Sequence, residues 1–197
     1  MTEAEFYGVY YEELLKVEKN MLERVGRMLD SLGTDSETAL AEHIKHRIKS
    51  PESAAEKLVR LGLSADAENA VKKLSDVVGL RVVTHFVGDI YTVLELIKRE
   101  PSWRIAAVKD YIASPKPNGY RSLHVILTLP FLEGEINTEI QLRTIAMDCW
   151  ASLEHQLKYK KSIKNTALIE EELKRCADEM ASTDLTMQTI RDLIKRD

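Results

Sequence analysis

The sequence predicts an α+β domain, in which a mixed, mostly antiparallel sheet of about five strands is packed against N- and C-terminal helices. Three observations support this class. Apolar residues recur at helical steps of three and four near both ends of the chain. The middle contains short runs in which apolar and polar residues alternate, as in strands that are buried on one side. Two of these runs follow each other at hairpin distance. Helices packed on such a sheet are a common layered arrangement.

The segment before the sheet is expected to be helical. Gly33 is a typical helix end, and Ser50 followed by Pro51 is a typical helix start. Ser36 can likewise cap a helix. The predicted helices cover residues 4–32, 36–49, 51–61 and 64–74.

Four of the strands can be assigned in the sequence, in the order β-α-β-β-β. They cover residues 77–86, 103–112, 121–129 and 136–143, with a helix at 90–99 after the first strand. The turns around Asn118 and Gly119, and around Gly134, delimit the last two strands. A helix is expected at 145–160, followed by helical sequence from 165 to the end with a break near 182–184.

Composition favours a single domain of a cytoplasmic protein. The chain has 197 residues and a formal net charge of −4, which does not indicate nucleic-acid binding. No segment has the pattern of a signal peptide or the length of a membrane span, so no membrane association is expected. Cys149 and Cys176 are isolated in helical patterns and are expected to be reduced and buried. We expect an N-terminal helix (1–35), a catalytic core (36–161) and C-terminal helices (162–197).

A polar face is predicted on the last two strands. Side chains alternate between the two sides of a strand, so Leu and Ile residues share one side of both strands. The opposite side then collects a hydroxyl, an imidazole, a carboxylate, an amide and a guanidinium, from Ser122, His124, Glu139, Gln141 and Arg143. An ordinary solvated sheet face would show the same alternation, so the pattern alone leaves both interpretations open.

The residue types near this face suit phosphate chemistry. Asp76 and Glu139 could bind a hard cation such as Mg²⁺ through oxygen. Ser50 begins a helix whose free backbone N–H groups could bind an anion. Tyr120, beside a glycine turn, could present its ring to a base. Basic side chains are numerous: Arg47, Lys49, Lys57, Arg60, Arg81, Lys109, Lys116, Arg121 and Arg143. These are the components of phosphoryl or pyrophosphoryl transfer. P-loop, Rossmann, HExxH and GxSxG motifs are absent from the sequence.

Five sequence motifs together resemble the synthetase domain of the RelA/SpoT family. They are RIKSPES (47–53), DVVGLRV (76–82), KPNGYRSLH (116–124), TEIQLRT (138–144) and WASLEHQLKYK (150–160). Their order and spacing are similar to those of the family's small, single-domain alarmone synthetases. Several linked motifs are more specific than any single one.

The resemblance implies a sheet fold related to nucleotidyltransferases and a Mg²⁺-dependent reaction between ATP and GDP or GTP. The β,γ-pyrophosphate of ATP would move to the 3′-hydroxyl of the guanine nucleotide, giving ppGpp or pppGpp. Asp76 and Glu139 would hold Mg²⁺, and Glu139 would act as the base. ATP would bind through Arg47, Lys49, Ser50, Lys57, Arg60 and Arg81. GDP or GTP would bind near Tyr120, Lys116, Asn118, Arg121, His124, Gln141, Lys109, Arg143 and His155.

The resemblance also sets expectations about regulation and leaves alternatives open. No His-Asp dipeptide occurs, so synthesis without hydrolysis is expected. A homotetramer is favoured, but His43, Lys45 and Asp148 do not clearly match an effector cleft for pppGpp. One alternative is a toxin-like relative that modifies the 3′-hydroxyl of tRNA or of an adenine nucleotide. Another is a catalytically silent module that senses nucleotides.

Overall fold

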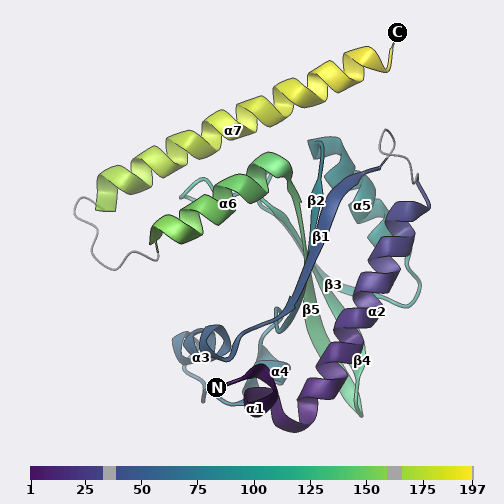
Figure 1. Ribbon diagram of the computed structural model, residues 1–197, viewed down its shortest axis with the longest axis vertical. Helices are drawn as coiled ribbons and strands as arrows, with labels where there is room; N and C mark the ends of the chain where they lie inside the picture. The colour runs from purple at the N-terminus through teal and green to yellow at the C-terminus, as the bar shows by residue number, and fades with distance from the viewer. Residues whose placement is uncertain (33–38, 159–165, 197) are drawn as a thin grey trace.

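The structure, a computed structural model, describes residues 1–32, 39–158 and 166–196 (Figure 1). Its helices are α1 (Glu3–Tyr7), α2 (Tyr11–Asp30), α3 (Pro51–Arg60), α4 (Ala67–Lys73), α5 (Val87–Arg99), α6 (Ile145–Lys158) and α7 (Thr166–Ile194), with a 3-10 turn, η1 (Gly8–Tyr10). Its strands are β1 (Ala41–Ile48), β2 (Val78–Thr84), β3 (Arg104–Asp110), β4 (Leu123–Phe131) and β5 (Gly134–Thr144).

The five strands form one sheet in the order β1-β2-β5-β4-β3. Strands β2 and β5 pair in parallel, and the other neighbouring pairs are antiparallel. The predicted mixed, mostly antiparallel sheet of about five strands is therefore confirmed. Strands β2 and β5 are interior strands, and each pairs with a neighbour along both of its edges.

The two faces of the sheet have different environments. Helices α2 and α5 pack on one face, whereas α6 and α7 lie over one end of the other, and α3 and α4 lie near its opposite end (Figure 1). The face under α2 and α5 is apolar, and Val125, Leu127, Ile140 and Leu142 are fully buried there. Strand alternation then directs the intervening residues of β4 and β5 to the other face, as predicted.

The predicted helix at 36–49 is wrong over residues 41–48, which form the edge strand β1. Ile44 and Ile48 are four residues apart, a spacing that fits one face of a helix and also one face of a strand. Pairing with β2 decides between the two, because β1 matches that strand residue for residue from His43 to Ile48. The predicted boundaries at Gly33 and Ser36 lie outside the described residues.

Three smaller expectations also differ from the structure. The N-terminal helix is divided by η1 into α1 and α2. Helix α7 is continuous through residues 182–184, where Thr183 Oγ1 donates a hydrogen bond to the carbonyl of Glu179 one turn earlier. Cys149 is exposed rather than buried, and Cys176 is half-buried.

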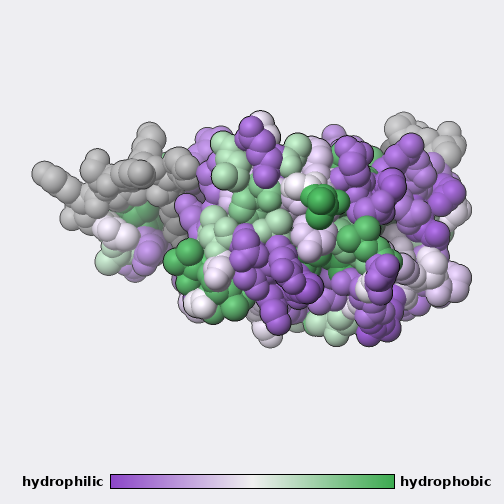
Figure 2. Space-filling model, turned by 90° about the horizontal axis from the view of Figure 1, so that it is seen from below, coloured by the Kyte–Doolittle hydropathy of each residue, from purple (hydrophilic) through white to green (hydrophobic). Residues whose placement is uncertain are grey.

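Hydrophilic side chains cover much of the face shown in Figure 2, with hydrophobic ones interspersed. Within the described part of the chain, no helix combines the length and the apolar character that crossing a membrane requires.

Candidate active site

A cavity of about 340 Å³ opens on the polar face, between β1, β2 and β5. Gly79 of β2 pairs with Arg47 on one side and with Glu139 on the other. Because Gly79 has no side chain, the space between those two residues stays open. The cavity is lined by Lys45, His46, Arg47, Asp76, Gly79, Leu80, Arg81, Glu139 and Gln141. It therefore brings together both predicted metal-binding carboxylates and both arginines predicted to bind ATP.

Glu139 is held on the floor of this site by two neighbours. Its Oε1 lies 2.9 Å from His124 Nδ1, and its Oε2 accepts a 2.7 Å hydrogen bond from Gln141 Nε2. Burial alone would raise the pKa of Glu139, and so would nearby Asp76, but the contacts to His124 and Gln141 outweigh them and lower that pKa. Glu139 is therefore a carboxylate at neutral pH.

Asp76 is held near the start of β2 by two lysines. Lys49 Nζ lies 3.0 Å from its Oδ2, and Lys57 Nζ lies 2.9 Å from its Oδ1. Burial would raise the pKa of Asp76, but the two ammonium groups lower it overall. Lys49 is fixed in turn, since its backbone carbonyl accepts a 2.8 Å hydrogen bond from the buried Tyr7 hydroxyl. Helix α1 thus helps to position the predicted ATP site.

The start of α3 is built as expected. The Ser50 hydroxyl accepts a hydrogen bond from the backbone N–H of Ser53, and Pro51 occupies the first turn. Lys57 lies on the same helix, and Arg60 is exposed in its last turn. Of the residues predicted to bind ATP, Lys49 and Lys57 are therefore at Asp76, whereas Arg60 is at the far end of α3.

The donor set suits Mg²⁺. This ion is commonly bound by one or two carboxylates together with substrate phosphates and water, rather than by a full protein cage. Asp76 and Glu139 are both ionised and both line the cavity. Among the described residues, Asp76 Oδ1 is buried without a well-aligned hydrogen bond, although Lys57 lies close to it. That oxygen has a lone pair available for a cation.

Tyr120 connects the loop before β4 to the polar face. Its hydroxyl lies 2.8 Å from His124 Nε2 and accepts a 2.8 Å hydrogen bond from Arg143. Lys116 Nζ lies 5.1 Å from the centre of the Tyr120 ring. The same Arg143 also donates to Gln141 Oε1 at 3.0 Å. A continuous polar network therefore runs from the loop to the Glu139 carboxylate.

Other predicted acceptor residues lie around this network or away from it. Lys109 is exposed on β3, in register with His124. The Asn118 amide donates to Glu154 of α6 at 3.2 Å. His155 is exposed on α6. Arg121 points away and contacts α7 instead. Ser122 is fully buried, and its hydroxyl donates to the carbonyl of Leu142.

Sequence reasoning missed the roles of two residues. Asp148, in the first turn of α6, is buried and forms ion pairs with Lys45 (3.3 Å), Arg81 (3.0 Å) and Arg143 (3.0 Å). Burial would raise the pKa of Asp148, but these cations lower it. Tyr111 follows β3, and its ring lies edge-on to His124. Alternation from Lys109 would have placed Tyr111 on the polar face.

The cavity combines carboxylates with basic side chains, and comparison with known proteins identifies the family to which the chain belongs. The family model described as the region found in RelA/SpoT proteins matches residues 46–164. The GTP pyrophosphokinase YwaC of Bacillus subtilis is 44% identical over 141 residues, which are 70% of this chain and 67% of that protein. The GTP pyrophosphokinase YjbM of the same organism is 33% identical over 154 residues, covering 76% and 72%.

Solved structures of small alarmone synthetases have a similar fold. The crystal structure of small alarmone synthetase 1 from Bacillus subtilis, bound to its product pppGpp, has a TM-score of 0.82 at 28% identity and covers 92% of this chain and 94% of that one. Small alarmone synthetase 2 from the same organism gives 0.77 at 35% identity, covering 91% and 96%. The chain belongs to the RelA/SpoT family. The predicted family, the fold and the assignment as a transferase are confirmed.

Proposed function

We propose that this chain transfers the β,γ-pyrophosphate of ATP to the 3′-hydroxyl of GDP or GTP, with Mg²⁺ as cofactor, giving AMP and ppGpp or pppGpp. The observation that carries the proposal is one cavity that is lined by Asp76, Glu139, Arg47 and Arg81. The relatives YwaC and YjbM are GTP pyrophosphokinases, which supports the same reaction. Such transfers depend mainly on positioning and on neutralising phosphate charge, and this site has groups for both.

The donor half of the site extends from α3 to β2. Arg47 and Arg81 lie on neighbouring strands at the cavity, where their planar guanidinium groups can stack on both faces of adenine. Lys49, Ser50, Lys57 and Arg60 would bind the phosphates through charge and through the start of α3. Mg²⁺, when bound by Asp76 and Glu139, would neutralise phosphate charge and orient the donor.

The acceptor half is centred on Tyr120 and Glu139. The Tyr120 ring would stack on guanine. Lys116, Asn118, His124, Gln141 and Arg143 would surround the nucleotide, with the exposed Lys109 and His155 further out, whereas Arg121 is directed to α7. Glu139 would take the proton of the 3′-hydroxyl. The 3′-oxygen then forms a bond to the β-phosphorus, the bond from that phosphorus to the α,β-bridging oxygen breaks, and AMP leaves with the bridging oxygen.

The remaining expectations extend this proposal. We propose synthesis without hydrolysis, because the sequence has no His-Asp dipeptide. We also propose a cytoplasmic homo-oligomer, with a tetramer favoured. Large apolar side chains exposed along α7, such as Leu185, Leu193 and Ile194, support self-association. Light scattering of the purified protein would measure the size of the assembly.

Transfer from γ-labelled ATP tests the proposed reaction. The protein is supplied with Mg²⁺ and with GDP, GTP, an adenine nucleotide and tRNA together, and label is expected in guanosine tetra- and pentaphosphate, with AMP as co-product. Glu139→Gln should reduce turnover by roughly a hundredfold or more. Glu135→Gln, an exposed change on the same strand, should leave turnover unchanged. Label in tRNA or in an adenine nucleotide, or no transfer at all, would contradict the proposal.

A further inference from the structure

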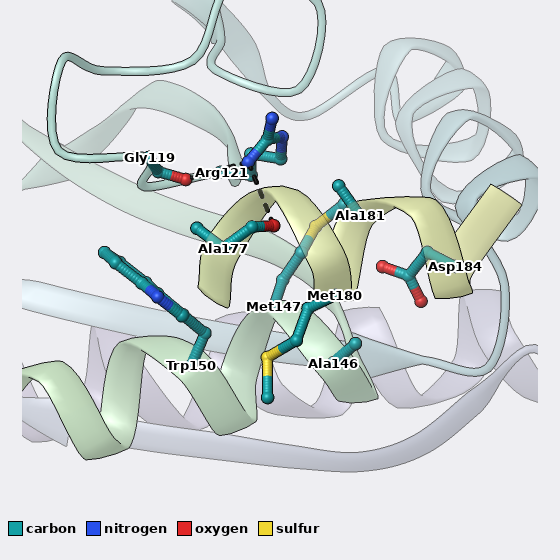
Figure 3. A pocket seen from close by; sticks show the side chains of 9 residues that line it. All are labelled: Gly119, Arg121, Ala146, Met147, Trp150, Ala177, Met180, Ala181 and Asp184. Carbon is teal, nitrogen blue, oxygen red and sulfur yellow. Dashed lines mark hydrogen bonds between the residues drawn. The ribbon is translucent and has the colours of Figure 1, made fainter. Parts of the chain in front are cut away.

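Helix α7 packs directly against the loop that carries Tyr120 (Figure 3). Gly119, which has a φ of +88°, faces Ala177 so closely that a Cβ at this glycine would lie 2.6 Å from the Ala177 Cβ. On the other side of Tyr120, Arg121 donates to the Ala177 carbonyl at 3.2 Å and to Asp178 Oδ1 at 2.9 Å. Both chain neighbours of Tyr120 are therefore attached to one turn of α7.

Helix α7 is itself firmly anchored to the domain. The Trp150 indole of α6 donates to the Leu173 carbonyl at 2.8 Å, and the Thr144 hydroxyl donates to the buried Asp184 at 2.6 Å. Further along, the backbone N–H of Gly88 donates to Gln188 at 2.9 Å. Contacts to α6, to β5 and to the start of α5 thus hold α7 in place on both sides of its contact with the loop.

We propose that α7 is a strap that sets the affinity for the guanine nucleotide, with Ala177 and Asp178 as positioning residues. This inference rests on the proposed function. The strap fixes Gly119 and Arg121, so the Tyr120 ring between them is presented to the polar face at low conformational cost. This assigns Arg121 a structural part in the acceptor site, since its guanidinium is directed to α7.

The strap should affect the acceptor and not the donor. The loop reaches the polar face through Tyr120, His124 and Arg143, whereas the predicted ATP phosphate ligands Lys49 and Lys57 lie at α3. A loop released from α7 would have to be ordered when the nucleotide binds, and that entropy loss weakens binding. Loss of the strap therefore predicts a higher KM for GDP and GTP at an unchanged KM for ATP.

Asp178→Lys is the test variant, because it places a cation against Arg121 on a half-exposed helix position. Glu179→Lys, the same charge change one residue further on, is the matched control, since Glu179 pairs with Arg175 on the outer surface of α7. Asp178→Glu keeps the carboxylate and should retain the parent's behaviour. In Asp178→Lys we expect KM for GDP and GTP to rise roughly three- to tenfold, while kcat and KM for ATP stay within about twofold.

Amide hydrogen exchange without nucleotides gives a second readout that does not depend on activity. Residues 116–121 should exchange faster in Asp178→Lys than in the parent, and Glu179→Lys should match the parent. Three results would contradict the proposed role of α7. They are unchanged exchange in Asp178→Lys, a parallel rise in its KM for ATP, or an equal effect of Glu179→Lys. If the unmodified protein forms no guanosine product, the proposed function is refuted. Hydrogen exchange alone would then test whether α7 orders the loop.

Discussion

Asp148→Asn tests whether one carboxylate aligns the arginines of both halves of the site. In the structure, Asp148 Oδ1 lies 3.0 Å from both Arg81 and Arg143. Arg81 lines the donor cavity, and Arg143 donates to Tyr120 and Gln141. The amide has nearly the same shape as the carboxylate. The substitution therefore removes the negative charge that pairs with three cations, without opening a cavity.

The expected loss of stability in Asp148→Asn follows from how deeply each partner of Asp148 is buried. The side chain of Asp148 is 8% exposed, that of Arg143 6%, that of Arg81 25% and that of Lys45 56%. Removing one partner of a fully buried pair costs about 3–5 kcal/mol, whereas exposed pairs contribute less than about 1 kcal/mol. Asparagine keeps one oxygen as an acceptor. We therefore expect a loss of about 2–3 kcal/mol, which lowers Tm by about 5–10 °C in a domain of this size.

Thermal unfolding and steady-state kinetics together measure this effect. Asp148→Asn should raise KM for ATP and lower kcat by roughly tenfold in total, because Arg81 and Arg143 are no longer held in place. The pKa of Asp148 is lowered in the folded state, so its stabilisation is present above about pH 4 and is lost as the pH falls through the lowered pKa. The Tm difference between variant and parent should therefore shrink in acid.

The control is Glu68→Gln, which breaks an exposed pair with Lys72 and should change stability by less than about 0.5 kcal/mol. If Asp148→Asn has the same Tm and kinetics as the parent, the ion pairs contribute nothing measurable and the reasoning is refuted. If stability falls but kinetics do not change, Asp148 supports the fold without aligning the arginines.

Three further predictions follow from single contacts. Gly119→Ala should destabilise the protein by about 1–3 kcal/mol in thermal unfolding, and more than Gly62→Ala, because both have positive φ but only Gly119 faces a close neighbour. Burial raises the pKa of Asp184, against the Thr144 hydrogen bond, so its contribution to stability falls as the pH rises above about 4. Asp184→Asn should therefore have a higher Tm than the parent at pH 7, and the difference should vanish below pH about 4. Chelation of divalent ions should abolish label transfer while leaving the circular dichroism spectrum unchanged, since Asp76 has lysine partners without a metal.

The polar face could be predicted from the sequence because strand alternation has a strict period of two. Once the Leu and Ile residues of β4 and β5 were assigned to the core, the positions of His124, Glu139 and Gln141 followed. Strand β1 could not be found in this way. Its polar side chains at 45, 46 and 47 are consecutive and all exposed on an edge strand, so apolar and polar residues do not alternate there, and its two isoleucines fit both periods.

The loop before β4 shows a different limit. Tyr120 and Arg121 are neighbours in the chain, yet one reaches His124 and the other reaches α7. A loop has no period from which side-chain direction can be read, and Asp178 lies 57 residues away from Arg121. The resemblance to a family predicted a role for Tyr120 and Arg121 but could not indicate that Arg121 is held by the C-terminal helix.

The ion pairs of Asp76 also predict how metal and nucleotide binding would be coupled. Asp76 is paired with Lys49 and Lys57, the same lysines that are proposed to bind ATP phosphates. Two lysines and a divalent ion compete for the same carboxylate. A divalent ion bound to Asp76 would therefore release the two ammonium groups, which could then bind the ATP phosphates. The pairing keeps the buried charges balanced before binding, which avoids the cost of an isolated carboxylate in the cavity. The metal and the donor nucleotide should therefore bind cooperatively. The metal would replace the two lysines at Asp76, and the ATP phosphates would replace Asp76 as the partner of those lysines.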